Sequence, residues 1–295
     1  MYGNRRALLL GLSAVLLWST VATAFKLALR QLDVFQLLFY ASTSSALVLL
    51  IALAIRGELG QLWRYLREAP AYFIGMALLN PCAYYLVLLS AYDRLPAQQA
   101  QAINYTWAIT LSLLAVPLLK QPLKGRDLMA AAGGYLGVLV IATQGDFSGL
   151  AFDNAGGVIL ALLSTVLWAL YWIVSAQNRR SATASMCLMF LLSVPVTAAL
   201  CHWFSALTVP DWQGLAAAVY VGMFEMGVTF MLWAAALRAA TRVALVGNLI
   251  FLSPFLSLVF IQMILGEQVH PSTLLGLALI VPAALYQQMD RSKPT

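Results

Sequence analysis

The chain has 295 residues, of which 62% are hydrophobic and only 9% are charged, and its formal net charge is +6. Soluble domains carry roughly a quarter charged residues, so this composition excludes an ordinary water-soluble enzyme or scaffold. Apolar runs of about twenty residues recur throughout, and each is long enough to cross roughly 30 Å of hydrocarbon. Because lipid offers backbone amides no partners, and the runs lack strand-like alternation, we predict an all-α polytopic membrane protein embedded in the lipid bilayer.

Ten transmembrane spans are predicted in chain order, and the connections between them are too short to hold a soluble module. At the N-terminus, Arg5, Arg6 and the following apolar run imitate a cleaved signal peptide. The run continues to Leu29, however, so we interpret it as the first span. The predicted spans cover residues 7–29, 34–55, 70–91, 97–119, 127–144, 154–176, 183–205, 212–237, 242–265 and 272–289.

Cationic residues in the connections give the predicted chain an orientation. With the N-terminus in the cytoplasm, only Arg30 and Arg94 fall in outer connections. Cationic connections resist translocation, so this asymmetry predicts a bacterial inner-membrane protein with both termini cytoplasmic. The same distribution accounts for the net positive charge without nucleic acid as a partner. The residues placed inside are Arg5, Arg6, Arg56, Arg64, Arg67, Lys120, Lys124, Arg126, Arg179, Arg180, Arg238, Arg242, Arg291 and Lys293.

The two halves of the chain resemble each other. Leu16-Leu17-Trp18 corresponds to Val166-Leu167-Trp168, and the stretch Ala91–Leu114 resembles Ala236–Val259. Each half holds five predicted spans, an odd number, so the second half has to be inverted in the membrane. Inverted repeats typically enclose a central cavity near the bilayer midplane and work by alternating access. We therefore predict two five-helix repeats, and a monomer suffices because one chain supplies both. The repeats cover residues 1–145 and 146–295.

Polar and aromatic side chains inside the spans mark a candidate substrate site, because hydrocarbon makes unpaired polar groups costly. They recur at helical spacing in spans four and six, and they flank Pro81 in span three. One interpretation is a cavity for a planar, partly apolar small molecule with one polar end, or for a flat cation. The other is that the rings fill space and the amides join helices. The substrate-binding candidates are Asn80, Tyr84, Asn104, Tyr105, Trp107, Trp168 and Tyr171.

Charged residues near or inside the spans receive separate predictions. Glu225 is the only carboxylate near a span centre, so it is a candidate for proton coupling, or else a hydrogen-bonded group that stabilises packing. Lys26 is predicted to snorkel outward as an anchor, and Glu267 to be solvated in the last outer connection. Spans five and ten are almost purely apolar and contain glycine, so they are predicted to be peripheral supports.

The sequence predicts no enzyme activity. The three cysteines and two histidines show neither metal-ligand spacing nor a nucleophile–base pattern. We therefore expect no metal and no cofactor.

Several motifs resemble the drug/metabolite transporter superfamily of the EamA type, and within it the aromatic amino-acid exporters. They are GLSAVLLWST over Gly11–Thr20, Asn104-Tyr105-Thr106-Trp107, and Leu167-Trp168-Ala169-x-Tyr171. The resemblance covers essentially the whole chain. It implies a ten-helix basket whose cavity is walled by spans one, three, four, six, eight and nine.

The resemblance also implies a function, which is export of aromatic or other hydrophobic amino acids and related small metabolites. The alternatives on the same fold are efflux of drugs or flat cations, and transport of nucleobases or other metabolites. One departure concerns span four, where the family usually has proline after the tryptophan of the Asn-Tyr-x-Trp segment. This chain has Ala108 there, which predicts a straighter helix than the family's.

Overall fold

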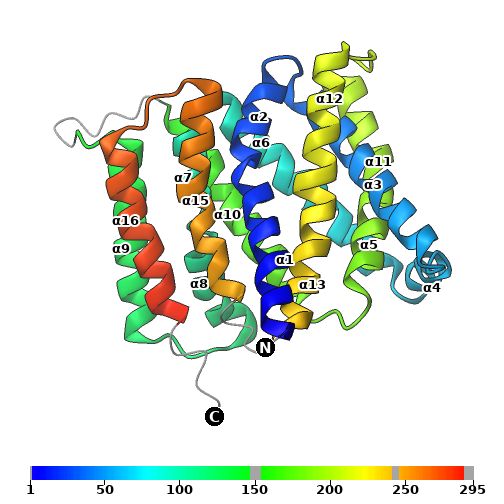
Figure 1. Ribbon diagram of the computed structural model, residues 1–295, viewed down its shortest axis with the longest axis horizontal. Helices are drawn as coiled ribbons and strands as arrows, with labels where there is room; N and C mark the ends of the chain where they lie inside the picture. The colour runs from blue at the N-terminus through cyan, green and yellow to red at the C-terminus, as the bar shows by residue number, and fades with distance from the viewer. Residues whose placement is uncertain (1, 147–153, 241–245, 289–295) are drawn as a thin grey trace.

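The computed structural model describes residues 2–146, 154–240 and 246–288, and all regular secondary structure within these ranges is helical (Figure 1). Nine helical stretches in this part of the chain are long and apolar enough to cross a membrane, and a shorter apolar helix covers residues 271–287. The predicted start of span nine at residue 242 and the end of span ten at residue 289 lie outside the described residues. The prediction of an all-helical polytopic membrane protein is confirmed.

Spans two, five, six, seven and ten are unbroken α-helices. Side-chain caps define where some of them begin. Asp33 accepts hydrogen bonds from the N–H groups of Phe35 and Gln36 at 2.8 and 3.0 Å. Asn154 accepts one from the N–H of Gly157 at 2.8 Å. These caps pair N–H groups that the first turn of a helix leaves free. The helices are α3 (Val34–Ile55), α9 (Gly125–Ala142), α10 (Ala155–Ser175), α11 (Ala182–Phe204) and α16 (Pro271–Gln288).

Spans one, three, four, eight and nine break or change helix type part-way. In span three, Asn80 has φ −147° and ψ 116°, which is not helical, directly before Pro81. In span eight, the π-helix η2 contains Glu225. Such interruptions redirect side chains and are common at functional sites. The segments are α1 (Tyr2–Ser19), α2 (Val21–Leu29), α5 (Pro70–Ala77), η1 (Leu78–Ala83), α6 (Tyr84–Arg94), α7 (Ala97–Asn104), α8 (Trp107–Leu119), α12 (Trp212–Tyr220), η2 (Val221–Val228), α13 (Thr229–Ala239), η3 (Asn248–Leu252), α15 (Ser253–Phe260) and η4 (Ile261–Leu265).

Span four is interrupted even though Ala108 replaces the expected proline. α7 ends at Asn104, and α8 begins at Trp107 after a turn. In this turn the carbonyl of Ile103 accepts hydrogen bonds from both the N–H and the hydroxyl of Thr106, at 3.1 and 2.8 Å. A threonine side chain that competes for a backbone carbonyl can end a helix without proline. Span four is therefore not one continuous α-helix, although no proline follows Trp107.

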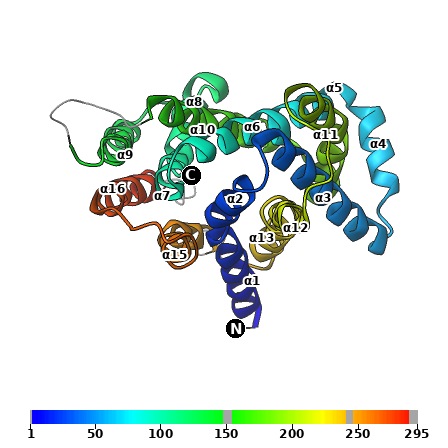
Figure 2. The same ribbon diagram turned by 90° about the horizontal axis from the view of Figure 1, so that it is seen from above.

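The helices of spans five and ten lie together at one side of the molecule, away from its centre (Figure 2). Their backbones approach closely, because a Cβ added to Gly137 of α9 would lie 2.7 Å from the carbonyl oxygen of Gly276 in α16. On the opposite side lies the short helix α4 (Gly60–Glu68), within the predicted connection between spans two and three. We call the end of the bundle where α1 begins the lower end and the opposite end the upper end, as in Figure 1.

Candidate functional site

A cavity of about 520 Å³ lies among the described residues of the five interrupted spans and span six. Pockets that bind small molecules usually enclose about 300–1,000 Å³, so this volume suits a metabolite-sized ligand. Its lining comes from spans one, three, four, six, eight and nine, each of which contributes an aromatic side chain: Trp18, Tyr84, Trp107, Trp168, Trp233 and Phe251. Neither α9 nor α16 contributes a residue to the described lining.

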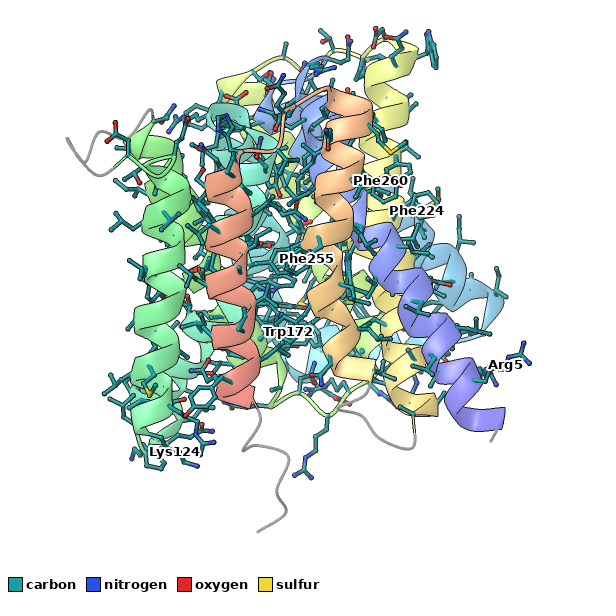
Figure 3. The ribbon with its side chains drawn as sticks, turned by 60° about the vertical axis from the view of Figure 1, so that its left-hand side comes forward. Arg5, Lys124, Trp172, Phe224, Phe255 and Phe260 are labelled. Atoms are coloured by element: carbon teal, nitrogen blue, oxygen red, sulfur yellow. The ribbon has the colours of Figure 1, made fainter. Side chains whose placement is uncertain are left out.

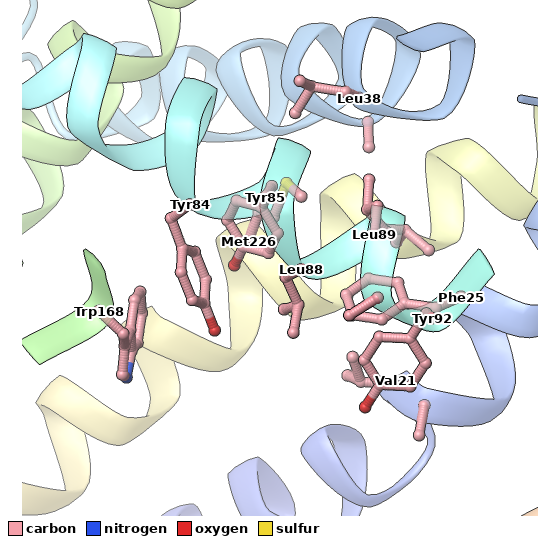
Figure 4. Close-up of a cluster of buried hydrophobic side chains, with 14 of the residues drawn as sticks. Val21, Phe25, Leu38, Tyr84, Tyr85, Leu88, Leu89, Tyr92, Trp168 and Met226 are labelled. Carbon is pink, nitrogen blue, oxygen red and sulfur yellow. The ribbon is translucent and has the colours of Figure 1, made fainter. Parts of the chain in front are cut away.

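Five of the lining side chains contact one another in a continuous series, which we call the aromatic wall: Trp18, Tyr84, Trp168, Phe230 and Trp233. Trp18 packs edge-on against Trp233 and Phe230, with ring centroids 5.4 and 5.3 Å apart. Phe230 contacts Trp168 at 6.1 Å, and Trp168 stacks on Tyr84 at 4.5 Å with 24° between the ring planes. Figure 4 shows Tyr84 and Trp168 facing each other. Flat side chains in this series offer stacking surfaces to a flat ligand.

Glu225 brings a carboxylate to this cavity. Its Oε1 accepts a hydrogen bond from the Tyr85 hydroxyl at 3.2 Å, and the Trp18 indole lies close to the same carboxylate. The other oxygen, Oε2, is buried and has no hydrogen-bond partner among the described residues. The η2 π-helix places Glu225 here, because a π turn shifts the register of the side chains that follow α12. Within the described part of the chain, no cluster of histidine, cysteine or acidic residues is suited to hold a metal ion.

The cavity lining contains Tyr84, Asn104, Tyr105, Trp107 and Trp168 of the sequence-derived candidates, together with Glu225. Asn104 also joins two spans, because its Nδ2 donates to the Ser164 hydroxyl at 2.9 Å. Tyr171 and Asn80 do not belong to the lining. Tyr171 stacks on Trp168 at 5.3 Å, and its hydroxyl lies beside Asn80, so both residues support the cavity from one layer behind.

Sequence reasoning missed several aromatic residues of the lining as binding candidates. Trp18 is the repeat equivalent of Trp168, and Trp233 follows Glu225 on one helix face, so signals for both were present in the sequence. Trp172 also belongs to the lining and lies inside the bundle in Figure 3. Phe230 carried no comparable signal, because its orientation depends on the π turn before it.

Comparison with known proteins agrees with this architecture. The profile of the EamA-like transporter family matches residues 5–143 and again residues 155–286. The chain belongs to the EamA-like transporter family.

Two individual proteins resemble this EamA-like transporter over most of its length. The aromatic amino acid exporter YddG of Ancylobacter novellus is 28% identical over 258 residues, which are 85% of this chain and 86% of that protein. A solved crystal structure is 23% identical, has a TM-score of 0.69, and covers 97% of this chain and 99% of its own. The second likeness supports the fold alone.

The upper end of the transporter's cavity is closed by hydrogen bonds that partly buried side chains make to backbone groups. Lys26 donates to the carbonyl oxygens of Tyr92 and Leu95 at 2.8 and 3.0 Å. Lys26 therefore caps the end of α6, where helix carbonyls are free and the helix dipole is negative. The prediction that Lys26 only anchors the span at the membrane surface was wrong, because these carbonyls bind its ammonium group. Tyr92 lies beside Phe25 at this closed end in Figure 4.

Hydrogen bonds at the upper end also join the two halves of the transporter. Glu267 accepts from the N–H of Ala97 at 3.2 Å, at the start of α7. The Gln98 side chain donates to the carbonyl of Gln268 at 2.8 Å and accepts from the Thr273 hydroxyl at 3.0 Å. The prediction that Glu267 is solvated was wrong, because its carboxylate caps a helix of the other half and its Oε2 is buried.

At the lower end, the described lining extends to residues that solvent reaches. It includes Leu119 at the end of α8, Gln121 in the following connection, and Ala176 after α10, all of them exposed. Most of the lining at this end is apolar, as at Leu111 and Leu237. Arg5 and Lys124 mark the same end in Figure 3. The described residues thus form a cavity that is sealed above and accessible from below.

Proposed function

We propose that this protein exports aromatic and other hydrophobic amino acids, and related small metabolites, across a bacterial inner membrane by alternating access. The aromatic wall of the cavity is the observation that carries this proposal. It lies about halfway along spans one, three, six and eight, where a bound ligand is equally far from both surfaces. The resemblance to a protein named as an aromatic amino acid exporter supports the same substrate class.

We further propose that residues 1–145 and 146–295 form two inverted repeats with ten spans. The two separate family matches support this division. So do the paired interruptions, because the third and fourth spans of each half break or change helix type near their middle. An even number of spans puts both termini on one side, and the positive-inside rule assigns that side to the cytoplasm. The lower end then faces the cytoplasm, and this conformation receives substrate from inside the cell.

Uptake into proteoliposomes tests the substrate proposal. Radiolabelled phenylalanine, tryptophan, threonine and alanine would be offered beside a flat aromatic cation and a nucleobase. We expect saturable uptake that favours the aromatic amino acids and falls at least about tenfold in Trp168→Ala, because a central stacking partner is lost. Trp203→Ala is the matched control, since Trp203 is 73% exposed and lies outside the cavity. Trp168→Phe keeps a ring and should recover part of the uptake.

The results of this panel separate the candidate functions. Saturable uptake of the cation alone would replace amino-acid export by drug or cation efflux, and preference for a nucleobase would assign a different metabolite. The specific observation that favours a cation as second candidate is the single carboxylate of the described lining, Glu225. Equal losses in Trp168→Ala and Trp203→Ala would contradict the assignment of this cavity.

Glu225 is also our candidate for proton coupling, because it is the only carboxylate of the described lining. The ionisable groups that interact electrostatically with it are Tyr84, Tyr85, Tyr92 and Tyr105. Transport of phenylalanine would be compared with and without an imposed pH gradient in the wild type and in Glu225→Gln. Gradient dependence that survives the substitution would exclude Glu225 as the proton carrier.

A further inference from the structure

We propose that Glu225 and the aromatic wall form an ammonium subsite, so that this transporter recognises its ligands by a positively charged amine and not by a carboxylate. The inference deepens the proposed function and rests on it, because it specifies which end of an amino acid the cavity binds. It extends the substrate class to aromatic monoamines that have no carboxylate.

The carboxylate of Glu225 is incompletely paired by the residues around it. Tyr85 donates one hydrogen bond to Oε1 and the Trp18 indole lies close to the same carboxylate, but both groups are neutral, and the buried Oε2 has no hydrogen-bond partner among the described residues. A buried ionised carboxylate is costly unless a positive group or several hydrogen bonds compensate it. An ammonium group carries a positive charge and N–H donors. It therefore compensates the charge of the Glu225 carboxylate and donates the hydrogen bonds that the protein does not supply.

No protein cation competes for this carboxylate within the described lining, which contains neither lysine, arginine nor histidine. The cation that belongs to the neighbouring upper end, Lys26, is held by the carbonyls of Tyr92 and Leu95. The electrostatic environment of the cavity therefore favours a positive ligand group and offers no counterion to a negative one. A carboxylate-bearing ligand without an amine would place like charges in one low-dielectric space.

The aromatic rings around Glu225 favour an organic ammonium ligand over a proton as the partner of its carboxylate. Trp18 lies close to the Glu225 carboxylate and contacts both Phe230 and Trp233. Faces of tryptophan and other aromatic rings attract cations through their quadrupole, and most strongly where water is excluded. A proton on the carboxylate would gain nothing from these rings. The combination of one carboxylate with several rings is the chemistry that binds organic ammonium groups.

The other buried lining atoms without a hydrogen-bond partner among the described residues, in Trp172 and Gln101, give a ligand carboxylate only weak partners. The indole N–H of Trp172 has no hydrogen-bond partner, and it is a neutral donor near the lower end. The unpaired Oε1 of Gln101 is an acceptor, which cannot bind a carboxylate. A single neutral donor contributes less than a charged pair. We therefore expect removal of the carboxylate from the ligand to cost little and removal of the amine to cost most of the binding.

Calorimetric titration of the purified full-length protein in detergent at pH 7 tests this directly with three ligands that share one ring. Phenylalanine has both charged groups, phenethylamine lacks the carboxylate, and 3-phenylpropionate lacks the amine. We expect phenethylamine to bind at least as tightly as phenylalanine, and 3-phenylpropionate at least about tenfold more weakly. In Glu225→Gln, the two amines should lose about tenfold or more in affinity. Glu225→Asp should keep the order of the ligands.

The control is Glu58→Gln, which changes a carboxylate in the connection between spans two and three, outside the cavity. Equal binding of phenethylamine and 3-phenylpropionate, or an unchanged order in Glu225→Gln, would overturn the ammonium subsite. If phenylalanine is nevertheless transported, the proposed export function stands and only this inference is wrong. Absence of both binding and transport of every aromatic amino acid and amine would contradict the two proposals together.

Discussion

The two ends of the cavity differ in the kind of contact that each provides. At the upper end, charged and amide side chains such as Lys26, Gln98 and Glu267 bind backbone groups across helices. At the lower end, the lining is mostly apolar and includes exposed Leu119. Water can replace polar contacts when an end opens, whereas apolar surfaces favour closing together. We infer that opening the upper end and closing the lower end partly offset each other in free energy, as alternating access requires.

Locking the upper end should have the largest effect on transport. A Cβ added to Gly157 in α10 would lie 3.3 Å from the Cβ of Arg94 in α6, so Arg94→Cys with Gly157→Cys is close to disulfide geometry. In a background with alanine at the native cysteines, oxidation should stop phenylalanine uptake in proteoliposomes, because the two halves can no longer separate. A reducing agent should restore it.

The matched control places a disulfide between the supporting helices of spans five and ten. A Cβ added to Gly133 would lie 3.6 Å from the Cβ of Ala283, so Gly133→Cys with Ala283→Cys should also form a bridge. Because α9 and α16 contribute nothing to the described cavity lining, this bridge should leave uptake intact. Uptake that continues with the Arg94–Gly157 bridge formed would show that the upper end does not open along α6 and α10.

Loosening the upper end should have a smaller effect. Lys26→Met keeps the length of the side chain but removes two hydrogen bonds from a charged donor. Each such bond contributes about 1.5–3 kcal/mol, so the upper-closed conformation should lose about tenfold or more in relative population. Hydrogen exchange over residues 92–100, measured in nanodiscs, should accelerate accordingly. Lys120→Met at the lower end is the control, and equal exchange in both variants would contradict a closing role for Lys26.

How well the sequence predicts the structure of the two ends of the cavity depends on the kind of contact that each end contains. Hydropathy and loop charge predicted the spans, because both follow from the residue types within each segment. Lys26 and Glu267 were misjudged because their partners are backbone groups at Tyr92, Leu95 and Ala97, which only tertiary packing brings near. A charged residue near a span end looks the same in sequence whether it snorkels or caps another helix.

The middle of the cavity was more predictable than its ends. Large aromatic residues deep inside spans, such as Tyr84 and Trp168, stand out from an apolar background, and both belong to the lining. Helical periodicity gives the face of a residue but not the layer that it occupies. Asn80 and Tyr171 therefore could not be separated from the lining by sequence, although they lie one layer behind it.

Changing the cavity lining near the middle of span four should alter affinity more than conformational balance. Trp107 begins α8 and belongs to the lining, where it is only partly buried. Stacking pairs of rings contribute about 0.5–1.5 kcal/mol, so Trp107→Ala should weaken apparent phenylalanine affinity about two- to tenfold. The rate at saturating substrate should stay near that of the wild type. Trp212→Ala is the control, because Trp212 is exposed and lies outside the cavity. If Trp107→Ala instead lowers the maximal rate and leaves the affinity unchanged, Trp107 takes part in the conformational change.

The smallest effect on transport is expected away from both ends, in the packing of α9 against α16. In Gly137→Ala the new methyl group would lie 2.7 Å from the carbonyl oxygen of Gly276, and a backbone atom cannot move aside as a flexible side chain can. Such overpacking typically costs about 1–3 kcal/mol, so the melting temperature in detergent should fall while phenylalanine affinity is unchanged. Gly75→Ala in α5, where an added Cβ meets nothing within 4 Å, should not lower the melting temperature. A change in affinity with Gly137→Ala would mean that these supporting helices take part in the movement between the two ends.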